Sequence, residues 1–376
     1  MNQSSRRTFL AAAGAGALLG AARDLPAAAV PSSPRTEGKR ILVLGGTGFL
    51  GPHFVRAAMA RGHVLTLFNR GKTNPQLFPD VEKLVGDREK GELQALEGRS
   101  FDAVVDTSGY VPAHVEATAR LFAAETTHYT FISTISVYDK FGERPDVFDE
   151  TSSVGEVSDE DAAKVNTIRG SMPFYGPLKA RCEQAALQAK PGRTFVVRPG
   201  LIVGPGDTTD RFTWWPVRID QGGAVLAPGD KDGLIQVIDV RDLADWMVHG
   251  IEQQLAGTYN ADGFDGRVSM EEFLHGCKLA TSKPVELVWG SEEFLKEHEV
   301  GAWMEMPLWI PREGRSIAAN DRARAAGLRF RPLADTIRDT LAWAKSERGD
   351  RPFARTGVKP DKEARLIALL RGAKKG

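Results

Sequence analysis

The chain has 376 residues, and its 49 Lys and Arg balance 49 Asp and Glu, so the formal net charge is +0. This balance excludes binding to nucleic acid or to an anionic membrane through overall basic charge. Two cysteines are too few for a disulfide framework, and seven dispersed histidines with no HxxxH pair predict no metal site. No apolar run reaches the roughly 18 residues of a membrane span, so we expect a globular enzyme or binding protein with no stable membrane span.

Residues 1–30 predict an export signal and are set aside from the fold. Arg6 and Arg7 precede a mildly apolar stretch from Phe9 to Gly20, and small residues follow at 27–29. An arginine pair, an apolar run and a cleavage site in this order are typical of a bacterial twin-arginine signal. We therefore expect a periplasmic protein; an N-terminus that merely contains two arginines is the alternative.

A buried strand at 39–44 runs into the sequence GGTGFLG (45–51), after which a helical pattern begins. Glycines at such a strand-to-helix turn permit a tight bend and let the backbone approach a pyrophosphate. The helix N-terminus offers free N–H groups to the phosphates. The next strand, 64–69, completes the βαβ unit that this interpretation requires. We expect a dinucleotide in contact with Gly45, Thr47, Gly48, Phe49, Leu50 and Gly51.

The end of the second strand indicates which nicotinamide dinucleotide binds. An acidic residue there would bind the ribose hydroxyls of NAD and repel the 2′-phosphate of NADP. This chain has Asn69 instead, followed by Arg70 and Lys72. These residues favour NADP over NAD; Arg70 stacked on adenine or facing solvent is the alternative.

Two further strands bring polar side chains toward the same edge of the sheet. The third ends at Asp87, where an aspartate commonly meets the adenine. The fourth, at 101–107, ends at Thr107 and Ser108, which would lie along the cofactor. Strands that alternate with helices predict an α/β fold with a Rossmann-type, doubly wound parallel sheet.

A fifth strand, at 129–133, leads into Thr134 and Ser136, and Tyr175 and Lys179 stand at the start of a later helix. Positions i and i+4 share a helix face, so we expect Lys179 beside the Tyr175 ring. A nearby ammonium would lower the pKa of the phenol, which could exchange a proton as a hydride moves to or from nicotinamide. Thr134 would bond the same substrate oxygen. A YxxxK pair alone is often a surface coincidence, but here it follows a glycine loop and a strand that ends in hydroxyl residues.

These motifs together resemble the extended short-chain dehydrogenase/reductase family, and more narrowly its NAD-dependent epimerase/dehydratase group, from about residue 40 to 348. The resemblance rests on the glycine loop, STISVY (133–138), YGPLK (175–179) and the segments 198–207, 237–242 and 259–260. It implies a catalytic triad of Thr134, Tyr175 and Lys179, with Lys179 also holding the cofactor. It also implies a Rossmann domain over 38–205 and about 236–262, and a smaller C-terminal α/β substrate lobe over 206–235 and 263–350. The tail, 351–376, is expected to be a surface element.

Three features depart from the family pattern. Ile135 and Ser136 follow Thr134 where sugar dehydratases carry Asp-Glu, which argues against dehydration. The interval before Tyr175 is long and holds the acidic run 159–161, expected as a loop over the site mouth that disfavours anionic substrates; a solvated surface loop is the alternative. Nucleotide sugars, the family's main substrates, are cytoplasmic, whereas this protein is expected to be exported.

We expect an NAD(P)-dependent oxidoreductase or epimerase that acts on a sugar or related polyol, with Ser136 and Arg211 contacting the substrate. An NADPH-dependent reductase of a non-sugar carbonyl is one alternative. A catalytically silent nucleotide- or RNA-binding protein is another, because the sequence LFNRG (67–71) resembles the chloroplast stem-loop RNA-binding proteins. Zero net charge and the intact triad count against RNA, and a homodimer is compatible with the sequence. Four tryptophans offer either sugar-binding faces or core packing: Trp214, Trp215, Trp303 and Trp309.

Overall fold

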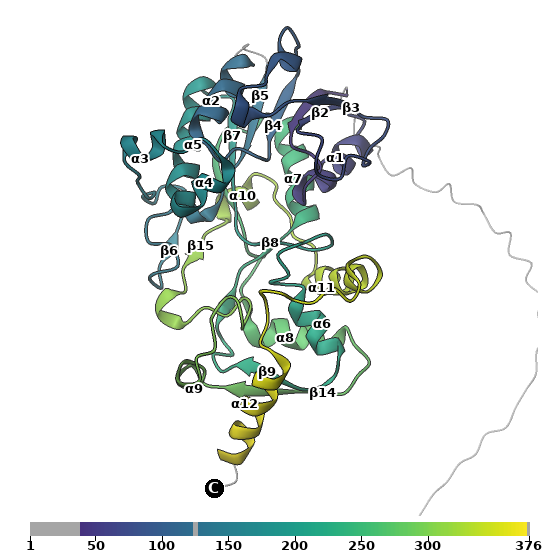
Figure 1. Cartoon of the computed structure of the whole chain (residues 1–376), viewed down its shortest axis with the longest axis vertical. Coiled ribbons are helices and arrows are strands. Elements are labelled where there is room, and N and C mark those ends of the chain that lie inside the picture. The colour runs from purple at the N-terminus through teal and green to yellow at the C-terminus, as the bar shows by residue number, and fades with distance from the viewer. Residues whose placement is uncertain (1–37, 123–126, 374–376) are drawn as a thin grey trace, which may run out of the picture. The chain divides into compact units, whose positions relative to one another are not determined.

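A seven-stranded parallel sheet organises the fold of the computed structural model, which describes residues 38–122 and 127–373 (Figure 1). The predicted export signal lies outside these residues. The strand order is β12-β7-β5-β4-β1-β2-β3, so the chain winds outward in both directions from β1, which confirms the predicted fold class. The strands are Arg40–Leu44 (β1), Val64–Asn69 (β2), Glu82–Val85 (β3), Ala103–Asp106 (β4), His128–Ile132 (β5), Thr194–Pro199 (β7) and Gly257–Ala261 (β12).

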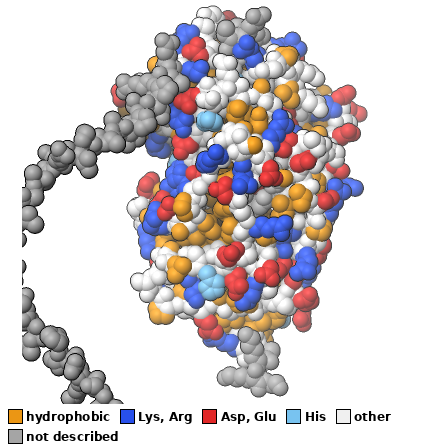
Figure 2. Space-filling view, turned by 180° about the vertical axis from the view of Figure 1, so that it is seen from behind, with side chains coloured by type: hydrophobic (Ala, Val, Ile, Leu, Met, Phe, Trp, Pro, Cys, Tyr) orange, Lys and Arg blue, Asp and Glu red, His pale blue; other side chains and the backbone are white. Residues whose placement is uncertain are grey.

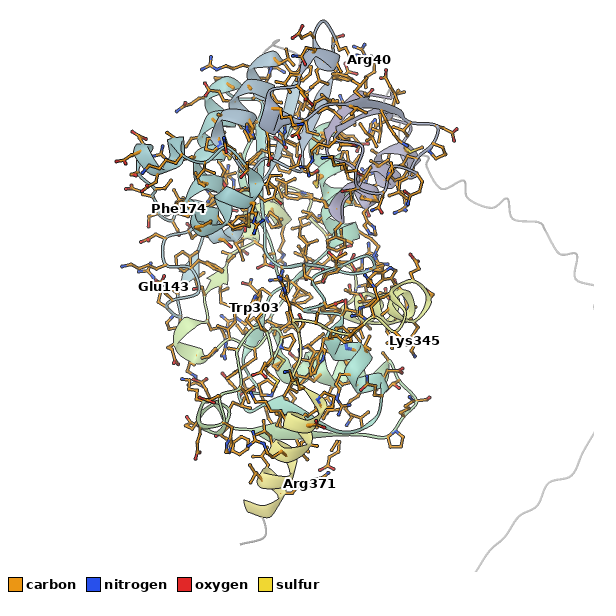
Figure 3. All side chains as sticks on the ribbon, in the orientation of Figure 1. Arg40, Glu143, Phe174, Trp303, Lys345 and Arg371 are labelled. Carbon is orange, nitrogen blue, oxygen red and sulfur yellow. The ribbon has the colours of Figure 1, made fainter. Side chains whose placement is uncertain are left out.

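Charged side chains of both signs lie on the surface, as the balanced composition predicts. Lys and Arg are interspersed with Asp and Glu over the face seen in Figure 2. Two of the exposed large apolar side chains, Met172 and Phe174, lie within the three residues before Tyr175, and Phe174 is labelled in Figure 3. Apolar surface is therefore free immediately beside a predicted catalytic residue.

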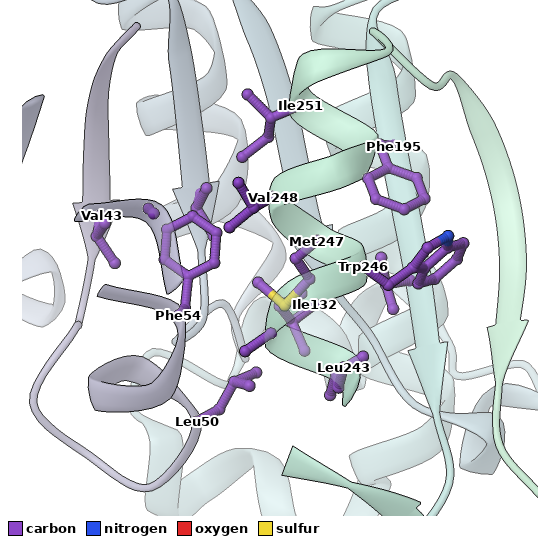
Figure 4. Close-up of a cluster of buried hydrophobic side chains, with 14 of the residues drawn as sticks. Val43, Leu50, Phe54, Ile132, Phe195, Leu243, Trp246, Met247, Val248 and Ile251 are labelled. Atoms are coloured by element: carbon purple, nitrogen blue, oxygen red, sulfur yellow. The ribbon is translucent and has the colours of Figure 1, made fainter. Parts of the chain in front are cut away.

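The alternation of side chains along β1 explains why helices cover both faces of the sheet. Ile41 and Val43 point to one face and Leu42 and Leu44 to the other, and none of them is more than 1% exposed. Figure 4 shows the core on the first face, where helices carry apolar stripes against the strands. The first face is covered by α1 (Leu50–Ala60) and α7 (Val240–Glu252), and the second by α2 (Pro112–Leu121) and α5 (Tyr175–Ala189).

A second buried core surrounds the parallel pair β9 (Gly223–Pro228) and β14 (Val285–Gly290). Trp215 is fully buried there, and its indole N–H donates to the carbonyl of Pro307 at 2.7 Å. Trp214 and Trp309 are buried in the same core, so core packing explains three of the four tryptophans that the sequence left open. The helices around this core are α6 (Trp214–Asp220), α8 (Met270–Leu279), α11 (Leu333–Trp343) and α12 (Pro360–Ala373).

The C-terminal tail, expected as a surface element, contributes to this second core. Leu366 and Ile367 of α12 are buried in it. The Glu363 carboxylate, also buried, accepts hydrogen bonds from the Arg218 guanidinium at 2.8 Å and from the Leu226 backbone at 3.1 Å. Burial of a charged carboxylate is tolerated because both partners satisfy it, and they fix α12 against β9.

The acidic run 159–161, expected within a loop, forms the first turn of the short helix α3 (Asp159–Ala163). Its three carboxylates accept hydrogen bonds from Lys164 and Arg181 at 2.7 to 3.2 Å, so two cations offset most of their charge. No helix in the two described ranges is long and apolar enough to cross a membrane. The remaining helices are α4 (Ile168–Ser171), α9 (Glu292–Glu297) and α10 (Asp321–Ala325), and the remaining strands are β6 (Val147–Phe148), β8 (Ile202–Val203), β10 (Leu234–Ile235), β11 (Ile238–Asp239), β13 (Val268–Ser269) and β15 (Ile317–Ala318).

Candidate active site

A pocket of about 190 Å³ opens where β1 to β4 end, at the carboxyl edge of the sheet. Ligands of doubly wound sheets bind at this edge, beside the point where the strand order reverses. The residues predicted to hold a cofactor that line the pocket are Gly45, Thr47, Gly48, Asn69, Arg70, Asp87 and Ser108, and those that do not line it are Phe49, Leu50, Gly51, Thr107 and Lys179. The other lining residues are Phe68, Lys72, Thr73, Gly86, Arg88, Glu89, His114 and Ile168.

Three of the four glycines in the loop 45–51 serve different purposes. Gly45 has a φ of +113°, and a Cβ added to it would lie 2.4 Å from Thr107 Oγ1. A Cβ on Gly51 would lie 2.5 Å from the carbonyl carbon of Gly46, so the helix could not pack against the turn. A Cβ on Gly48 would meet nothing within 4 Å. The fold itself requires Gly45 and Gly51, whereas Gly48 keeps open a space that fits the pyrophosphate of a dinucleotide.

Two asparagines hold the glycine loop in place. Asn69 Nδ2 donates to the Gly45 carbonyl at 3.0 Å, and its Oδ1 accepts from the Gly71 N–H at 2.8 Å. The Asn69 side chain therefore braces the loop. Asn74, in the left-handed region at a φ of 44°, donates to the Thr47 carbonyl at 2.9 Å. The sequence reasoning missed Asn74, although the Asn-Pro dipeptide it forms with Pro75 is a turn signal.

A buried ion pair that the sequence reasoning also missed lies under the pocket. Arg88 binds both carboxylate oxygens of Asp106, at 2.7 and 2.9 Å, and donates to Ser108 Oγ at 2.8 Å. Tyr129 donates its hydroxyl to the same carboxylate at 3.2 Å. Burial opposes the charge of Asp106, but the charge and hydrogen bonds of Arg88 outweigh it and hold the pKa of Asp106 below its usual value. The pair fixes Ser108 at the pocket wall.

The remaining predicted cofactor residues lie around the pocket. Phe49 precedes α1, and Leu50, the first residue of that helix, packs its side chain into the core, so only its backbone faces the turn. Thr107 donates its hydroxyl to the Leu44 carbonyl at 3.0 Å, as Ser108 does at 3.1 Å.

The predicted catalytic hydroxyls come together where α5 begins and β5 ends. Tyr175 is the first residue of α5, and its phenol is hydrogen-bonded to Thr134. Thr134 Oγ1 accepts from the Ser136 N–H at 3.1 Å and lies 3.2 Å from the Ser136 hydroxyl. The close approach depends on Gly176, where an added Cβ would lie 2.0 Å from the Ser136 carbonyl oxygen. Thr134, Ser136 and Tyr175 thus form one cluster of hydroxyl groups.

Lys179 lies next to this cluster, but its ammonium is directed at backbone carbonyls. Its Nζ donates to the carbonyls of Ile132 at 2.5 Å and Gly109 at 2.7 Å, and burial lowers its pKa to about 8. Burial raises the pKa of Tyr175, while the hydrogen bond to Thr134 and the charge of Arg211 act in the opposite direction. The predicted lowering of the Tyr175 pKa by Lys179 is therefore wrong, because burial outweighs the charges near the phenol.

Tyr110 is a further aromatic neighbour that the sequence reasoning did not identify. Its ring centroid lies 6.2 Å from that of Tyr175, and Lys179 Nζ lies 5.1 Å from the Tyr110 ring and 4.3 Å from the Phe131 ring. Aromatic faces attract a cation, so these rings help to hold the buried ammonium. The predicted substrate residue Arg211 also comes near, since its charge influences the Tyr175 phenol.

Known proteins share this sequence pattern over much of the chain. It is 27% identical over 263 residues to the chloroplast stem-loop binding protein of 41 kDa b from Arabidopsis thaliana, a match that covers 65% of this chain and 64% of that protein, less than two thirds of its length. It is 25% identical over 260 residues to the epimerase family protein SDR39U1 from Bos taurus, covering 65% of this chain and 81% of that protein.

Solved structures share the fold at lower identity. The Bordetella bronchiseptica enzyme WbmG in complex with NAD and UDP superposes with a TM-score of 0.60 at 17% identity, covering 84% of this chain and 96% of that chain. The UDP-glucuronic acid 4-epimerase from Bacillus cereus in complex with NAD gives a TM-score of 0.58 at 14% identity, covering 84% and 99%. Residues 41–261, more than half of the sequence, match the NAD dependent epimerase/dehydratase family, and the chain therefore belongs to this family.

Proposed function

We propose that this protein is an NAD(P)-dependent epimerase or oxidoreductase that acts on a sugar or related polyol. The observation that carries the proposal is the cluster of Thr134, Ser136 and Tyr175 hydroxyls beside Lys179, on the same sheet edge as the nucleotide pocket. Membership of the family supports it. WbmG and the Bacillus cereus epimerase, with their NAD, UDP and UDP-glucuronic acid, support a sugar substrate by analogy of fold alone.

The residues present fit a dinucleotide at the open space over Gly48. Gly45, Thr47 and the N-terminus of α1 would hold the pyrophosphate, and Lys179 would hold the nicotinamide ribose. When bound, the nicotinamide supplies a hydride acceptor or donor. The chain itself provides the pocket, the orientation of the substrate oxygen by Thr134 and the proton at the Tyr175 phenol.

The direction of proton transfer follows from the environment of Tyr175. Because burial raises its pKa, the phenol keeps its proton at neutral pH. It is thus suited to donate that proton to a substrate carbonyl oxygen, and in the reverse step the phenolate takes it back. A site that works in both directions can oxidise a substrate hydroxyl and reduce the resulting carbonyl, which is the sequence that epimerisation requires.

NADP is our proposed cofactor, with NAD as the alternative. Arg70 and Lys72 line the pocket and are exposed at its rim, and neither has an ion-pair partner in the described ranges. Asn69 stands where an acidic residue binds the ribose of NAD in Rossmann folds, but it is neutral and hydrogen-bonded to the glycine loop and to Gly71. Two uncompensated cations beside a neutral side chain favour a ribose that carries a phosphate.

The function is tested by identifying the nucleotide and then the substrate. Mass spectrometry of the nucleotide released from the purified protein identifies the cofactor. A panel of sugars and ring ketones, followed through the absorbance of reduced nicotinamide and through product chromatography, then separates epimerase, sugar oxidoreductase and reductase of a non-sugar carbonyl. No bound nucleotide and no turnover on any member of the panel would contradict the proposal.

RNA binding is a second candidate, favoured by the Arabidopsis thaliana protein, whose name describes stem-loop binding. The chain has a formal net charge of +0, and the face in Figure 2 mixes both signs of charge. A stem-loop RNA titrated at two salt concentrations tests this candidate, because binding through phosphates weakens steeply with salt. Tight, salt-dependent binding together with no turnover would favour it over the enzyme.

A further inference from the structure

Arg211 is a half-buried arginine with no carboxylate partner, close to the candidate catalytic phenol. Its Nε donates to Thr209 Oγ1 at 3.4 Å, a long hydrogen bond, and it forms no ion pair within residues 38–122 and 127–373. Its charge opposes the rise that burial causes in the pKa of Tyr175, so the two groups lie within electrostatic reach. The N–H groups of the two terminal guanidinium nitrogens therefore make no hydrogen bond within the described residues.

The neighbouring carboxylates are engaged by other residues. Asp207 is fully buried and accepts from the Thr209 N–H at 2.7 Å and from the Thr209 hydroxyl at 3.0 Å. Burial raises the pKa of Asp207, and the charge of nearby Arg211 acts in the opposite direction, although the two side chains form no ion pair in the described residues. Asp210 accepts two hydrogen bonds from the guanidinium of Arg348, at 2.8 and 2.9 Å. A guanidinium withdrawn from water without a carboxylate in contact is costly unless a ligand supplies the partner.

The backbone places Arg211 by means of two unusual conformations. Asp210 and Trp303 have φ values of 62° and 65°, in the left-handed region that non-glycine residues rarely adopt. The central carbon of the Arg211 guanidinium lies 5.2 Å from the centroid of the Trp303 ring, which is labelled in Figure 3. Such conformations cluster at functional sites, where surrounding contacts maintain them. Stacking on an indole holds the guanidinium by its face and leaves its edge for hydrogen bonds.

We propose that Arg211 binds a carboxylate of the substrate near the carbon on which Tyr175 acts, so that the substrate is an acidic sugar or another polyol acid. This inference rests on the proposed function and names its substrate class. The planar fork of a guanidinium matches the two oxygens of a carboxylate. A phosphate offers similar oxygens, and the test below separates the two groups.

The acidic run 159–161 does not oppose this proposal. It was expected to disfavour anionic substrates, but Lys164 and Arg181 pair with its carboxylates. Arg211 thus supplies a positive charge near Tyr175 that forms no ion pair in the described residues, while two cations contact the three carboxylates of the acidic run.

Equilibrium binding to the mature, cofactor-loaded protein tests the proposal. Two ligand pairs differ only in the carboxylate: methyl β-D-glucuronide against methyl β-D-glucoside, and UDP-glucuronic acid against UDP-glucose. In at least one pair we expect the acid to bind about 10- to 100-fold more tightly, the range for hydrogen bonds to a charged group. Glucose 6-phosphate serves as the phosphate probe and is expected to bind more weakly than the tighter acid.

Variants connect this preference to Arg211. Arg211→Met should reduce the acid-to-neutral ratio to about one, and Arg211→Lys should keep part of it, because charge remains without the planar fork. Arg322→Met is the matched control: Arg322 also stacks on an aromatic ring, that of Tyr259 at 4.7 Å, but is exposed, and its loss should leave the ratio unchanged.

The proposal is overturned by a wild-type ratio near one in both pairs, by failure of all four sugars to bind, by preference for glucose 6-phosphate, or by a ratio that survives in Arg211→Met. The acid-to-neutral affinity ratio of the wild-type protein tests the proposal even if a variant does not fold. An acid preference without any hydride transfer would contradict the proposed function and leave the carboxylate site standing. Turnover of neutral sugars with an acid-to-neutral ratio of one would support the proposed function and overturn the carboxylate site.

Discussion

Alanine at Gly48 and at Gly51 should separate nucleotide binding from folding. A methyl group on Gly51 would lie 2.5 to 2.8 Å from backbone atoms of Gly46, which cannot move unless the whole turn shifts. Overpacking of this kind costs about 1–3 kcal/mol. A methyl group on Gly48 meets no atom within 4 Å, and this glycine does not have a left-handed φ. We therefore expect Gly48→Ala to change the free energy of unfolding by less than about 1 kcal/mol.

Nucleotide affinity should respond in the opposite order, with the larger loss in Gly48→Ala. The Gly48 methyl would occupy the open space proposed for the pyrophosphate, so nucleotide affinity should fall at least about tenfold, or about 1.4 kcal/mol. Gly51→Ala that remains folded should lose less affinity, because its methyl points at Gly46 and neither residue lines the pocket. Urea unfolding gives the stability of each variant, and titration with NADPH followed by nicotinamide fluorescence gives the affinity.

Two results would refute this reasoning. Unchanged affinity in Gly48→Ala would mean that the pyrophosphate does not approach Gly48. Equal losses of stability in both variants would mean that the space over Gly48 is not open in solution. Leu279→Ala is a suitable control, since Leu279 is 89% exposed and its loss should affect neither measurement.

Two other substitutions test the chemistry, and a third tests how a buried carboxylate affects stability. Tyr175→Phe should lower turnover by about 100-fold or more with cofactor affinity nearly unchanged, and a variant above one hundredth of the wild-type rate contradicts the proton role. Arg70→Ala should weaken NADP more than NAD by about 1–3 kcal/mol, whereas equal losses would mean that Arg70 only stacks on adenine. Asp262 is 1% exposed, and burial raises its pKa from 3.8 to about 7. Between these pH values the folded state keeps a proton that the unfolded state releases, so stability falls as pH rises, by about 4 kcal/mol. Asp262→Asn should remove this part of the decline in urea unfolding at stepped pH, and parallel declines in both proteins would refute it.

Features of the site that depend on local backbone were predictable from the sequence. The glycine loop and the Tyr175–Lys179 spacing each lie within a single turn or helix, so short-range rules place them correctly. The sequence analysis placed Thr134 and Ser136 together because both follow the fifth strand, and it expected Thr134 to bond the same substrate oxygen as Tyr175. In each case the relevant atoms are fixed by a few neighbouring residues or by the strand order.

Features that depend on contacts distant in sequence were not predictable. The pairing of Arg88 with Asp106, and of Arg211 with Trp303, requires knowledge of which loops meet. Spacing placed Lys179 on the correct face of α5, but it did not show that two backbone carbonyls hold its ammonium. The direction of the Tyr175 pKa was missed because the reasoning considered a neighbouring charge and left out burial.

The predicted export signal and the proposed chemistry together lead to a last prediction. Little free NADP(H) is available outside the cytoplasm, and a twin-arginine route exports folded proteins, so a bound cofactor can travel with the enzyme. An exported enzyme should then retain its cofactor and return it to its starting state within each cycle, as oxidation and re-reduction of one substrate does. Retention through micromolar dilution requires at least about −8 kcal/mol of binding. Mature protein purified from the periplasmic fraction without added nucleotide should release close to one cofactor per chain on denaturation. Substoichiometric cofactor, with activity that depends on added NADPH, would instead indicate a simple reductase that exchanges its cofactor in every cycle.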